Sequence, residues 1–203
     1  ERASGQPRLV NFLLRSLART RGLNDPLTLA REYTTRYATM ASAWLGLAEV
    51  YSLSDDRKGQ EEALRKAVEV EPANSDAWLA LAQFLDESDN LPELTTVFRK
   101  LVALLPDDPF VANNLAYCVL RSNGDTAEAL ALAKGASEKL HMHPNVLHTL
   151  GLAQLRSGDL EEGRKNLGLA LEMQPGDPTM LLDFGAMLIQ QDKKADGRKL
   201  IEM

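Results

Sequence analysis

Residues 44–51 read WLGLAEVY, and residues 78–85, 34 positions further along the chain, read WLALAQFL. A fixed period in the thirties is typical of helical repeat proteins. In each copy the apolar residues recur at spacings of three and four, stop at a polar cluster and then resume, which predicts two amphipathic helices joined by a tight turn. Pro72 and Pro106 follow the second helices, where proline prevents the helix from continuing. The sequence therefore predicts a repeated helix-turn-helix unit.

The position after the repeated leucine is small in five successive copies. Its occupants are Ala48, Ala82, Ala116, Gly151 and Gly185. Two helices approach closely only where little side chain lies between their backbones, so this column predicts the packing seam within each unit. Glycine inside a helix costs about 1 kcal/mol relative to alanine. The two glycines therefore indicate that contact distance outweighs helix propensity at those sites.

These residues resemble the tetratricopeptide repeat (TPR) family: a tryptophan, a leucine and a small residue on the first helix, alternating small and large apolar residues on the second, and a closing proline. The resemblance implies an all-α fold, a right-handed superhelical solenoid of about six helix-turn-helix units with the first divergent and the last truncated. The expected units, within one domain 1–203, are 7–40, 41–74, 75–108, 109–143, 144–177 and 178–203. One extra residue is expected near the turn Asn123–Asp125, because Leu150 follows Leu115 by 35 positions. The openings Asn113–Ala116 and Leu147–Gly151 resemble, more narrowly, tandem-TPR proteins of bacteria, many of them associated with the cell envelope and polysaccharide export.

Composition restricts the class of protein. With 203 residues, 44% hydrophobic and 26% charged, the chain is typical of a soluble globular or solenoid protein, and six repeats leave no room for a separate catalytic domain. The net charge of −6 argues against nucleic acid as the main partner, and no apolar run approaches the ~18 residues of a membrane span. Both ends read as cuts in a longer polypeptide, so a targeting signal would lie outside, and the compartment stays open between the cytoplasm and a bacterial envelope or periplasm. The single cysteine, Cys118, is expected to be a small buried apolar residue.

No pattern of a catalytic, cofactor or metal site is present. The sequence has no phosphate-binding glycine loop, no Cys-x-x-Cys pair and no Gly-x-Ser-x-Gly turn, so we expect no enzyme activity, no catalytic residues and no cofactor. His141, His143 and His148 cluster within eight residues, but they lack the i, i+4 spacing of a helical metal site. An inter-repeat loop is the favoured interpretation over a metal site. Gly124 and Gly158 are expected to be turn glycines.

Candidate binding residues follow from the resemblance. In the TPR family the first helices line a concave groove, and the groove-facing positions lie beside the packing stripe. The corresponding residues that we select as the peptide-binding groove are Leu45, Glu49, Asp76, Leu79, Gln83, Asp86, Glu87, Asn113, Tyr117, Arg121, His148, Leu152 and Arg156. Arg8, Asn11, Arg15 and Arg19 would precede them, so the groove is expected to be basic at its start, acidic in its middle and apolar to basic toward its end. Leu45 and Glu49 occupy positions where chaperone-tail clamps carry lysine and asparagine, which argues against that ligand.

The resulting hypothesis is a non-catalytic protein-interaction scaffold that holds a peptide or helix of another protein. An acidic band of Glu49, Asp76, Asp86 and Glu87, with leucines beside it, predicts a ligand segment with lysine or arginine near its centre and apolar anchors. Two alternatives stay open. In the first alternative, the chain is a regulatory or substrate-presenting region of a larger enzyme or envelope export machine. In the second, it is a self-assembly module.

Overall fold

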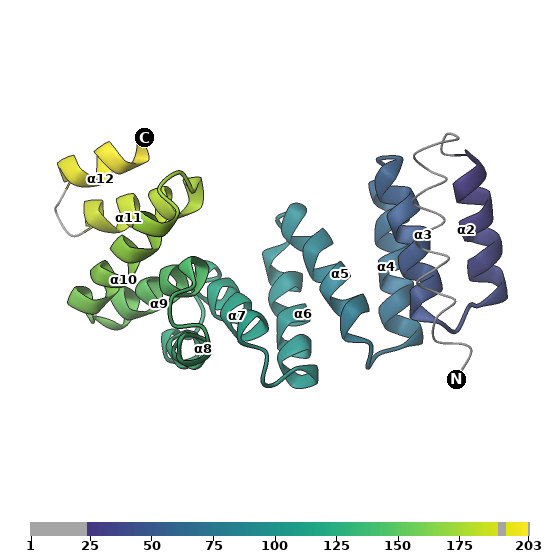
Figure 1. The fold of residues 1–203 in the computed structure, drawn as a ribbon, viewed down its shortest axis with the longest axis horizontal. Helices are drawn as coiled ribbons and strands as arrows, with labels where there is room; N and C mark the ends of the chain where they lie inside the picture. Colours follow the sequence, from purple (N-terminus) through teal and green to yellow (C-terminus); the bar gives the residue numbers. More distant parts are fainter. Residues whose placement is uncertain (1–23, 191–193, 203) are drawn as a thin grey trace. The chain divides into compact units, whose positions relative to one another are not determined.

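The computed structural model of the chain describes residues 24–190 and 194–202. The chain divides into two compact units, residues 1–90 (unit 1) and residues 91–203 (unit 2). The secondary structure of the described residues is helical throughout, and the helices follow one another as helix-turn-helix pairs (Figure 1). The predicted all-α fold of tandem helix-turn-helix repeats is confirmed.

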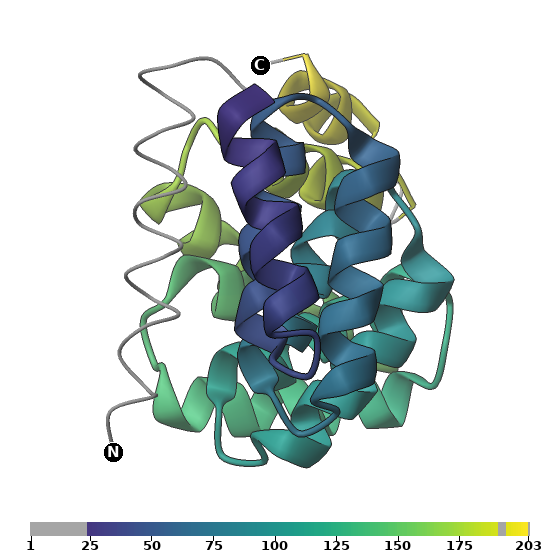
Figure 2. The same cartoon turned by 90° about the vertical axis from the view of Figure 1, so that its right-hand side faces the viewer.

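Unit 1 contains four described helices, α2 (Asn24–Arg36), α3 (Ala41–Leu53), α4 (Arg57–Val70) and α5 (Ser75–Glu87). Helix α2 lies alongside α3 in both views (Figures 1 and 2). Fully buried alanines from three helices meet in one cluster, Ala41 of α3, Ala67 of α4 and Ala77 of α5. Because these side chains are small, the three helices pack closely, and the half-buried Trp44 covers the cluster.

Unit 2 contains seven helices among its described residues. They are α6 (Leu91–Leu104), α7 (Pro109–Arg121), α8 (Thr126–Lys139), α9 (Pro144–Ser157), α10 (Leu160–Met173), α11 (Pro178–Gln190) and α12 (Lys194–Ile201). Two buried clusters join α9, α10 and α11: Leu147 with Ala170 and Met180, and Leu167 with Met187 and Leu188. No helix in either described stretch is long and apolar enough to cross a membrane.

The period of the helices follows the period of the sequence. First helices begin at residues 41, 75, 109, 144 and 178, which are spaced by 34, 34, 35 and 34 positions. The extra residue lies in the turn 122–125, as predicted, because α7 begins 34 positions after α5 whereas α8 begins 35 after α6. The boundary between the two units lies between Asn90 and Leu91 in the sequence. The expected repeat 75–108 therefore has α5 in unit 1 and α6 in unit 2. The part of the expected unit 7–40 before Asn24, with the groove residues Arg8, Asn11, Arg15 and Arg19, lies outside the described residues.

The turns inside the repeats share one left-handed residue. Asp55, Asp89, Asn123 and Gly158 have φ values of 57°, 51°, 52° and 96° and occupy equivalent repeat positions. A left-handed residue after the last helical turn lets the next N–H groups return to the helix carbonyls, and asparagine, aspartate and glycine tolerate it best. Gly158 therefore has the expected role. In the longer turn Asn123 takes the left-handed conformation instead of Gly124.

Side-chain caps begin several of the helices. Asp56, Asn74, Asp108 and Asp125 each accept a hydrogen bond from a backbone N–H of the first turn that follows. Such a cap stabilises a helix by about 1 kcal/mol. At α5 the cap is Asn74, whose side-chain carbonyl accepts from Ala77 N–H at 3.1 Å, while the neighbouring Ser75 is already helical.

The repeated tryptophans make equivalent contacts. Trp44 Nε1 donates to the Ala38 carbonyl at 2.8 Å, and Trp78 Nε1 donates to the Pro72 carbonyl at 2.9 Å. Both bonds run six residues back along the chain, to the segment that precedes the helix. Each indole thus fixes the entry of its helix while its ring is only partly exposed.

The small column forms a close seam in unit 2. A Cβ atom built on Gly151 of α9 would lie 2.8 Å from Leu167 Cγ and 2.9 Å from the Gly163 carbonyl oxygen of α10. A Cβ built on Gly163 would lie 3.0 Å from the Gly151 carbonyl oxygen. One repeat later, a Cβ on Gly197 would lie 2.5 Å from the Gly185 carbonyl oxygen. The predicted seam is confirmed at the two glycines of the column, each with a second glycine opposite.

Candidate functional site

Unit 1 has an open hollow between its first helices. The hollow measures about 330 Å³ and is bordered by α3, α4 and α5. We call it the unit 1 hollow. The residues that line it are Leu45, Ala48, Glu49, Ser52, Gln60, Leu64, Ala80, Gln83, Phe84 and Glu87. Four predicted groove residues are in this lining, Leu45, Glu49, Gln83 and Glu87. Asp76, Leu79 and Asp86 are exposed on α5 and lie outside it.

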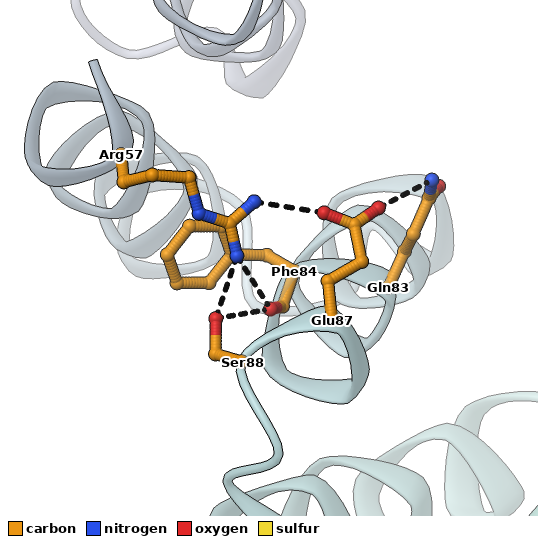
Figure 3. A network of polar contacts seen from close by, with 5 residues as sticks. All are labelled: Arg57, Gln83, Phe84, Glu87 and Ser88. Atoms are coloured by element: carbon orange, nitrogen blue, oxygen red, sulfur yellow. Dashed lines mark hydrogen bonds and ion pairs between the residues drawn. The ribbon is translucent and has the colours of Figure 1, made fainter. Parts of the chain in front are cut away.

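A polar network occupies one edge of the unit 1 hollow (Figure 3). Arg57, the first residue of α4, donates from Nη1 to Glu87 Oε2 at 2.8 Å and from Nη2 to Ser88 Oγ at 2.7 Å. Its guanidinium carbon lies 4.3 Å from the ring centroid of Phe84, and Gln83 Nε2 donates to Glu87 Oε1 at 3.2 Å. The hydrogen bond from Arg57 lowers the pKa of Glu87, and the one from Gln83 lowers it further.

This network changes the electrostatics expected from the sequence. The proposed acidic band contained Glu87 as a negative charge, whereas the structure pairs that carboxylate with Arg57 of the neighbouring helix. Both side chains stay roughly half exposed, 42% for Arg57 and 48% for Glu87, so solvent screens the pair. The sequence did not single out Arg57, because its charge lies on a second helix and the groove was expected on first helices.

Unit 2 presents a larger hollow at the carboxyl-terminal ends of its first helices. It measures about 440 Å³ and lies between α7, α9 and α11, with one residue of α10. The lining of this apolar hollow is Tyr117, Leu120, Arg121, Leu152, Leu155, Arg156, Leu160, Asp183, Ala186 and Met187. Leucine, alanine and methionine side chains supply six of the ten lining residues, and the charged groups are two arginines and one aspartate.

A smaller polar hollow lies on the same three helices, toward their amino-terminal ends. It measures about 190 Å³ and shares Tyr117 with the apolar hollow. Its lining is Asn113, Asn114, Tyr117, Asn145, His148, Thr149, Asp177, Thr179 and Met180. We call the two hollows together the α7–α9–α11 face. The six groove residues that the sequence placed in the fourth and fifth units, Asn113, Tyr117, Arg121, His148, Leu152 and Arg156, all line this face.

One buried polar atom on this face has no hydrogen-bond partner. Asn113 is 4% exposed, and its Oδ1 atom is unpaired. His148 is 5% exposed, and its Nε2 atom lies 3.1 Å from Asp183 Oδ2. A buried polar group without a partner costs about 1–3 kcal/mol, and most such groups in proteins are paired. Asn113 Oδ1 is therefore suited to a donor from outside the chain.

The two arginines of the apolar hollow border the end of α7. Arg156 donates from Nη1 to the Leu120 carbonyl at 2.5 Å, which satisfies one of the last carbonyls of that helix. The guanidinium carbon of Arg121 lies 5.9 Å from the ring centroid of Tyr117. Because a guanidinium has five N–H donors, each arginine can hold such a contact and bind a further acceptor.

The sequence missed several residues of this face, among them Asp183, Thr149 and Asn114. All three occupy one repeat position, two residues before the small column, and Ala80 of the unit 1 hollow occupies the same position. Comparing that column across the repeats would have shown polar residues in three successive copies. The groove positions taken from the family did not include it.

The three histidines have different surroundings. His143 stacks edge-on against Phe110 with centroids 5.2 Å apart, His148 faces Asp183 and Tyr117, and His141 is exposed. No group of three or more His, Cys, Asp or Glu side chains suited to a metal occurs among residues 24–190 and 194–202. Cys118 is buried in α7, as expected.

Comparisons with known proteins agree with the repeat architecture. The family model described as tetratricopeptide repeat matches residues 41–84. A TPR repeat-containing protein of Dictyostelium discoideum is 30% identical over 136 residues, covering 63% of this chain and 51% of that protein. Residues 41–84 of this chain thus match the TPR family. The chain spans about half the length of that curated relative.

Solved TPR structures share the fold. The TPR protein YrrB, described as having an unusual peptide-binding site, superimposes with a TM-score of 0.67 at 19% identity, covering 85% of this chain and 88% of YrrB. The type IV pilus biogenesis factor PilW gives a TM-score of 0.69 at 15% identity, covering 98% of this chain and 91% of PilW. MamA of Desulfovibrio magneticus RS-1 gives 0.63 at 15% identity, covering 80% and 91%. At these identities the likeness concerns the fold alone, and the predicted resemblance to bacterial proteins stays a prediction.

Proposed function

We propose that this chain is a non-catalytic scaffold that binds a segment of another protein on its α7–α9–α11 face. One observation carries the proposal. Two adjoining hollows on three first helices contain the unpaired buried acceptor Asn113 Oδ1. A fold that leaves a polar atom unpaired at a surface hollow gains most from a ligand that satisfies it.

The shape of the face favours a chain segment over a compact molecule. The polar hollow lies near the amino-terminal ends of the three helices and the apolar hollow near their carboxyl-terminal ends, with Tyr117 in both. A ligand that fills both must supply polar groups at one end and an apolar group at the other. Main chain with one large side chain has this combination, and a peptide-binding site is described for the TPR protein YrrB.

The unit 1 hollow is a second candidate binding surface. Glu49 and Glu87 line it beside Leu45, which agrees with the predicted ligand that carries lysine or arginine and apolar anchors. Arg57 already pairs with Glu87, so we expect this surface to discriminate between ligand charges less than its acidic residues alone would suggest.

The proposal is tested by selecting 12-residue peptides from a random displayed library on the chain and measuring the affinity of the selected peptides. Leu152→Asp places a charge in the apolar hollow and should weaken binding at least tenfold. Leu132→Asp is the matched control: Leu132 is also half-buried in a helix, but it lies on α8 outside the face. Melting curves of both variants are compared with the parent.

The results test the face itself and separate the scaffold from the self-assembly module. Equal affinities for the two variants would exclude this face as the peptide site. If no peptide is selected and the chain forms defined dimers by light scattering, the self-assembly alternative replaces the scaffold. A regulatory region of a larger enzyme would give peptide binding on the same face, and its target would then lie within its own longer polypeptide.

A further inference from the structure

We infer that the α7–α9–α11 face selects segments in which a large apolar side chain stands next to an acidic one. The inference rests on the proposed function, because it names the chemistry of the segment that this face would bind. It combines three features of the face: the apolar hollow, the sign of the charges around it and the unpaired Oδ1 atom of Asn113 beside it.

The apolar hollow supplies the anchor site. Leu120 and Met187 form buried parts of its wall, 4% and 8% exposed, while Leu152 and Leu155 are half-buried and Leu160 is 43% exposed. These side chains present apolar surface from four helices toward one hollow of about 440 Å³. Covering such surface with an aliphatic or aromatic side chain contributes affinity in proportion to the area removed from water.

The charges around the anchor site favour a carboxylate. Arg121 and Arg156 carry two positive charges and Asp183 one negative charge, so the rim of the apolar hollow is net positive. Guanidinium groups bind carboxylates through paired N–H donors more readily than they bind other protein groups. An acidic residue adjacent to the anchor would reach this rim, whereas a lysine there would face two like charges.

Asp183 opposes this preference, and that makes it informative. Its carboxylate lines the apolar hollow and lies 3.1 Å from His148 Nε2 of the polar hollow. Its negative charge lies in the same hollow and therefore disfavours a ligand carboxylate there. Replacing Asp183 by asparagine keeps the shape of the side chain and removes the negative charge, so an acidic segment should bind more tightly to the variant.

The unpaired Oδ1 atom of Asn113 would fix the position of the segment's main chain. Asn113 Oδ1 is an acceptor without a donor, and an N–H of the bound main chain would satisfy it. Asn113→Leu replaces the amide by an apolar side chain of similar size. The variant should be as stable as the parent or more stable, because an unpaired buried acceptor is removed, and yet it should bind the segment more weakly.

The test uses synthetic 9-residue peptides with leucine or phenylalanine at the centre and aspartate, lysine or alanine at each neighbouring position, measured by fluorescence anisotropy. Acidic peptides should bind the parent more tightly than their lysine counterparts, by about five- to twentyfold if each rim contact is of ordinary strength. Asp183→Asn should tighten the acidic peptides about two- to fivefold, and Arg121→Gln should weaken them by a similar factor.

Glu172→Gln is the matched control for net charge. Glu172 is exposed on α10 and lines neither hollow, so this variant should leave all affinities unchanged. A gain of affinity in Asp183→Asn alone cannot come from damage to the fold. Peptides that bind this face with a lysine preference, or with no charge preference, would overturn the inference while keeping the proposed function. Absence of binding by every peptide, with or without charge, would overturn both.

Discussion

Equivalent repeat positions have different surroundings in the two units. In unit 2, Gly151 and Gly163 bring the backbones of α9 and α10 into contact, with Leu167 against them. The equivalent residues of unit 1 are Ala48, Gln60 and Leu64, and all three line an open hollow. At one of these positions Gln60 of unit 1 lines the hollow, whereas Gly163 of unit 2 lies against Leu155 and the Gly151 carbonyl.

The two units therefore differ in which helices line their hollows. Where the first and second helices close on glycines, the hollows of unit 2 lie between successive first helices α7, α9 and α11. In unit 1 the hollow also reaches the second helix, because Gln60 and Leu64 of α4 line it. A ligand of unit 1 would therefore contact a second helix, including the end that carries Arg57, which the family pattern does not predict.

The largest effect is expected from placing the unit 1 residue in the unit 2 seam. Gly163→Gln would push a side chain into Leu155 and the Gly151 carbonyl, and overpacking of this kind costs about 1–3 kcal/mol or more. The control Gly168→Gln lies on the same helix with no atom within 4 Å of a built Cβ, so it should gain up to about 1 kcal/mol from helix propensity. Urea unfolding of both variants measures the difference. Equal stabilities would show that the seam is not close-packed.

A smaller change tests the same contact from the other helix. Gly151→Ala adds one methyl group 2.8 Å from Leu167 Cγ and 2.9 Å from the Gly163 carbonyl, so we expect a loss of about 1–2 kcal/mol despite the better helix propensity of alanine. Gly135→Ala on α8 meets nothing within 4 Å and should be stabilising by about 0.5–1 kcal/mol. Opposite signs in thermal melts support the account; a gain at both sites would contradict it.

The sequence predicted the period, the turns and the small column because these depend on local rules. Helical spacing, turn residues and closing prolines are visible in a single chain, and the extra residue at 122–125 followed from counting. The glycine pairing across the seam was not predicted, because Gly163 and Gly197 appear ordinary until the backbone opposite them is known.

The candidate site was predicted in part. Family positions located six residues of the α7–α9–α11 face, since first helices repeat their exposure with the period. The sequence did not reveal that Arg57 reaches Glu87 or that Asp183 approaches His148, because long side chains from different helices meet only in three dimensions. The sequence prediction counted only the acidic residues of the first helices, so it overestimated the negative charge of the acidic band in unit 1.

In unit 1, Gln60→Ala should leave the free energy of unfolding unchanged or raise it slightly, whereas Gly163→Gln should lower it. The Oε1 atom of Gln60 is buried without a hydrogen-bond partner, and alanine has the better helix propensity. We expect the variant to be as stable as the parent or up to about 1 kcal/mol more stable in urea. A loss above that size would mean that Gln60 packs or bonds in a way that the open hollow does not suggest.

The smallest effect concerns Arg57. Arg57→Ala removes a half-exposed ion pair and a cation–π contact, which together contribute about 0.5–1 kcal/mol. The hydrogen bond from Arg57 lowers the pKa of Glu87, so its stabilisation is present above the unfolded pKa of glutamate and is lost as the pH falls through the folded value. Parent and variant should differ at pH 7 and converge in acid, in urea unfolding at pH 7 and pH 3. A difference that grows in acid would contradict this sign.

We propose unit 2, through its α7–α9–α11 face, as the principal peptide-binding surface. Methyl NMR of leucine and methionine side chains during titration with an acidic, leucine-centred peptide tests this proposal. We expect the methyl signals of Leu120, Leu152, Leu155 and Met187 to shift together and saturate with one affinity, while those of Leu45 and Leu64 in unit 1 stay unchanged. Saturable shifts confined to Leu45 and Leu64, with the unit 2 methyls unmoved, would contradict it.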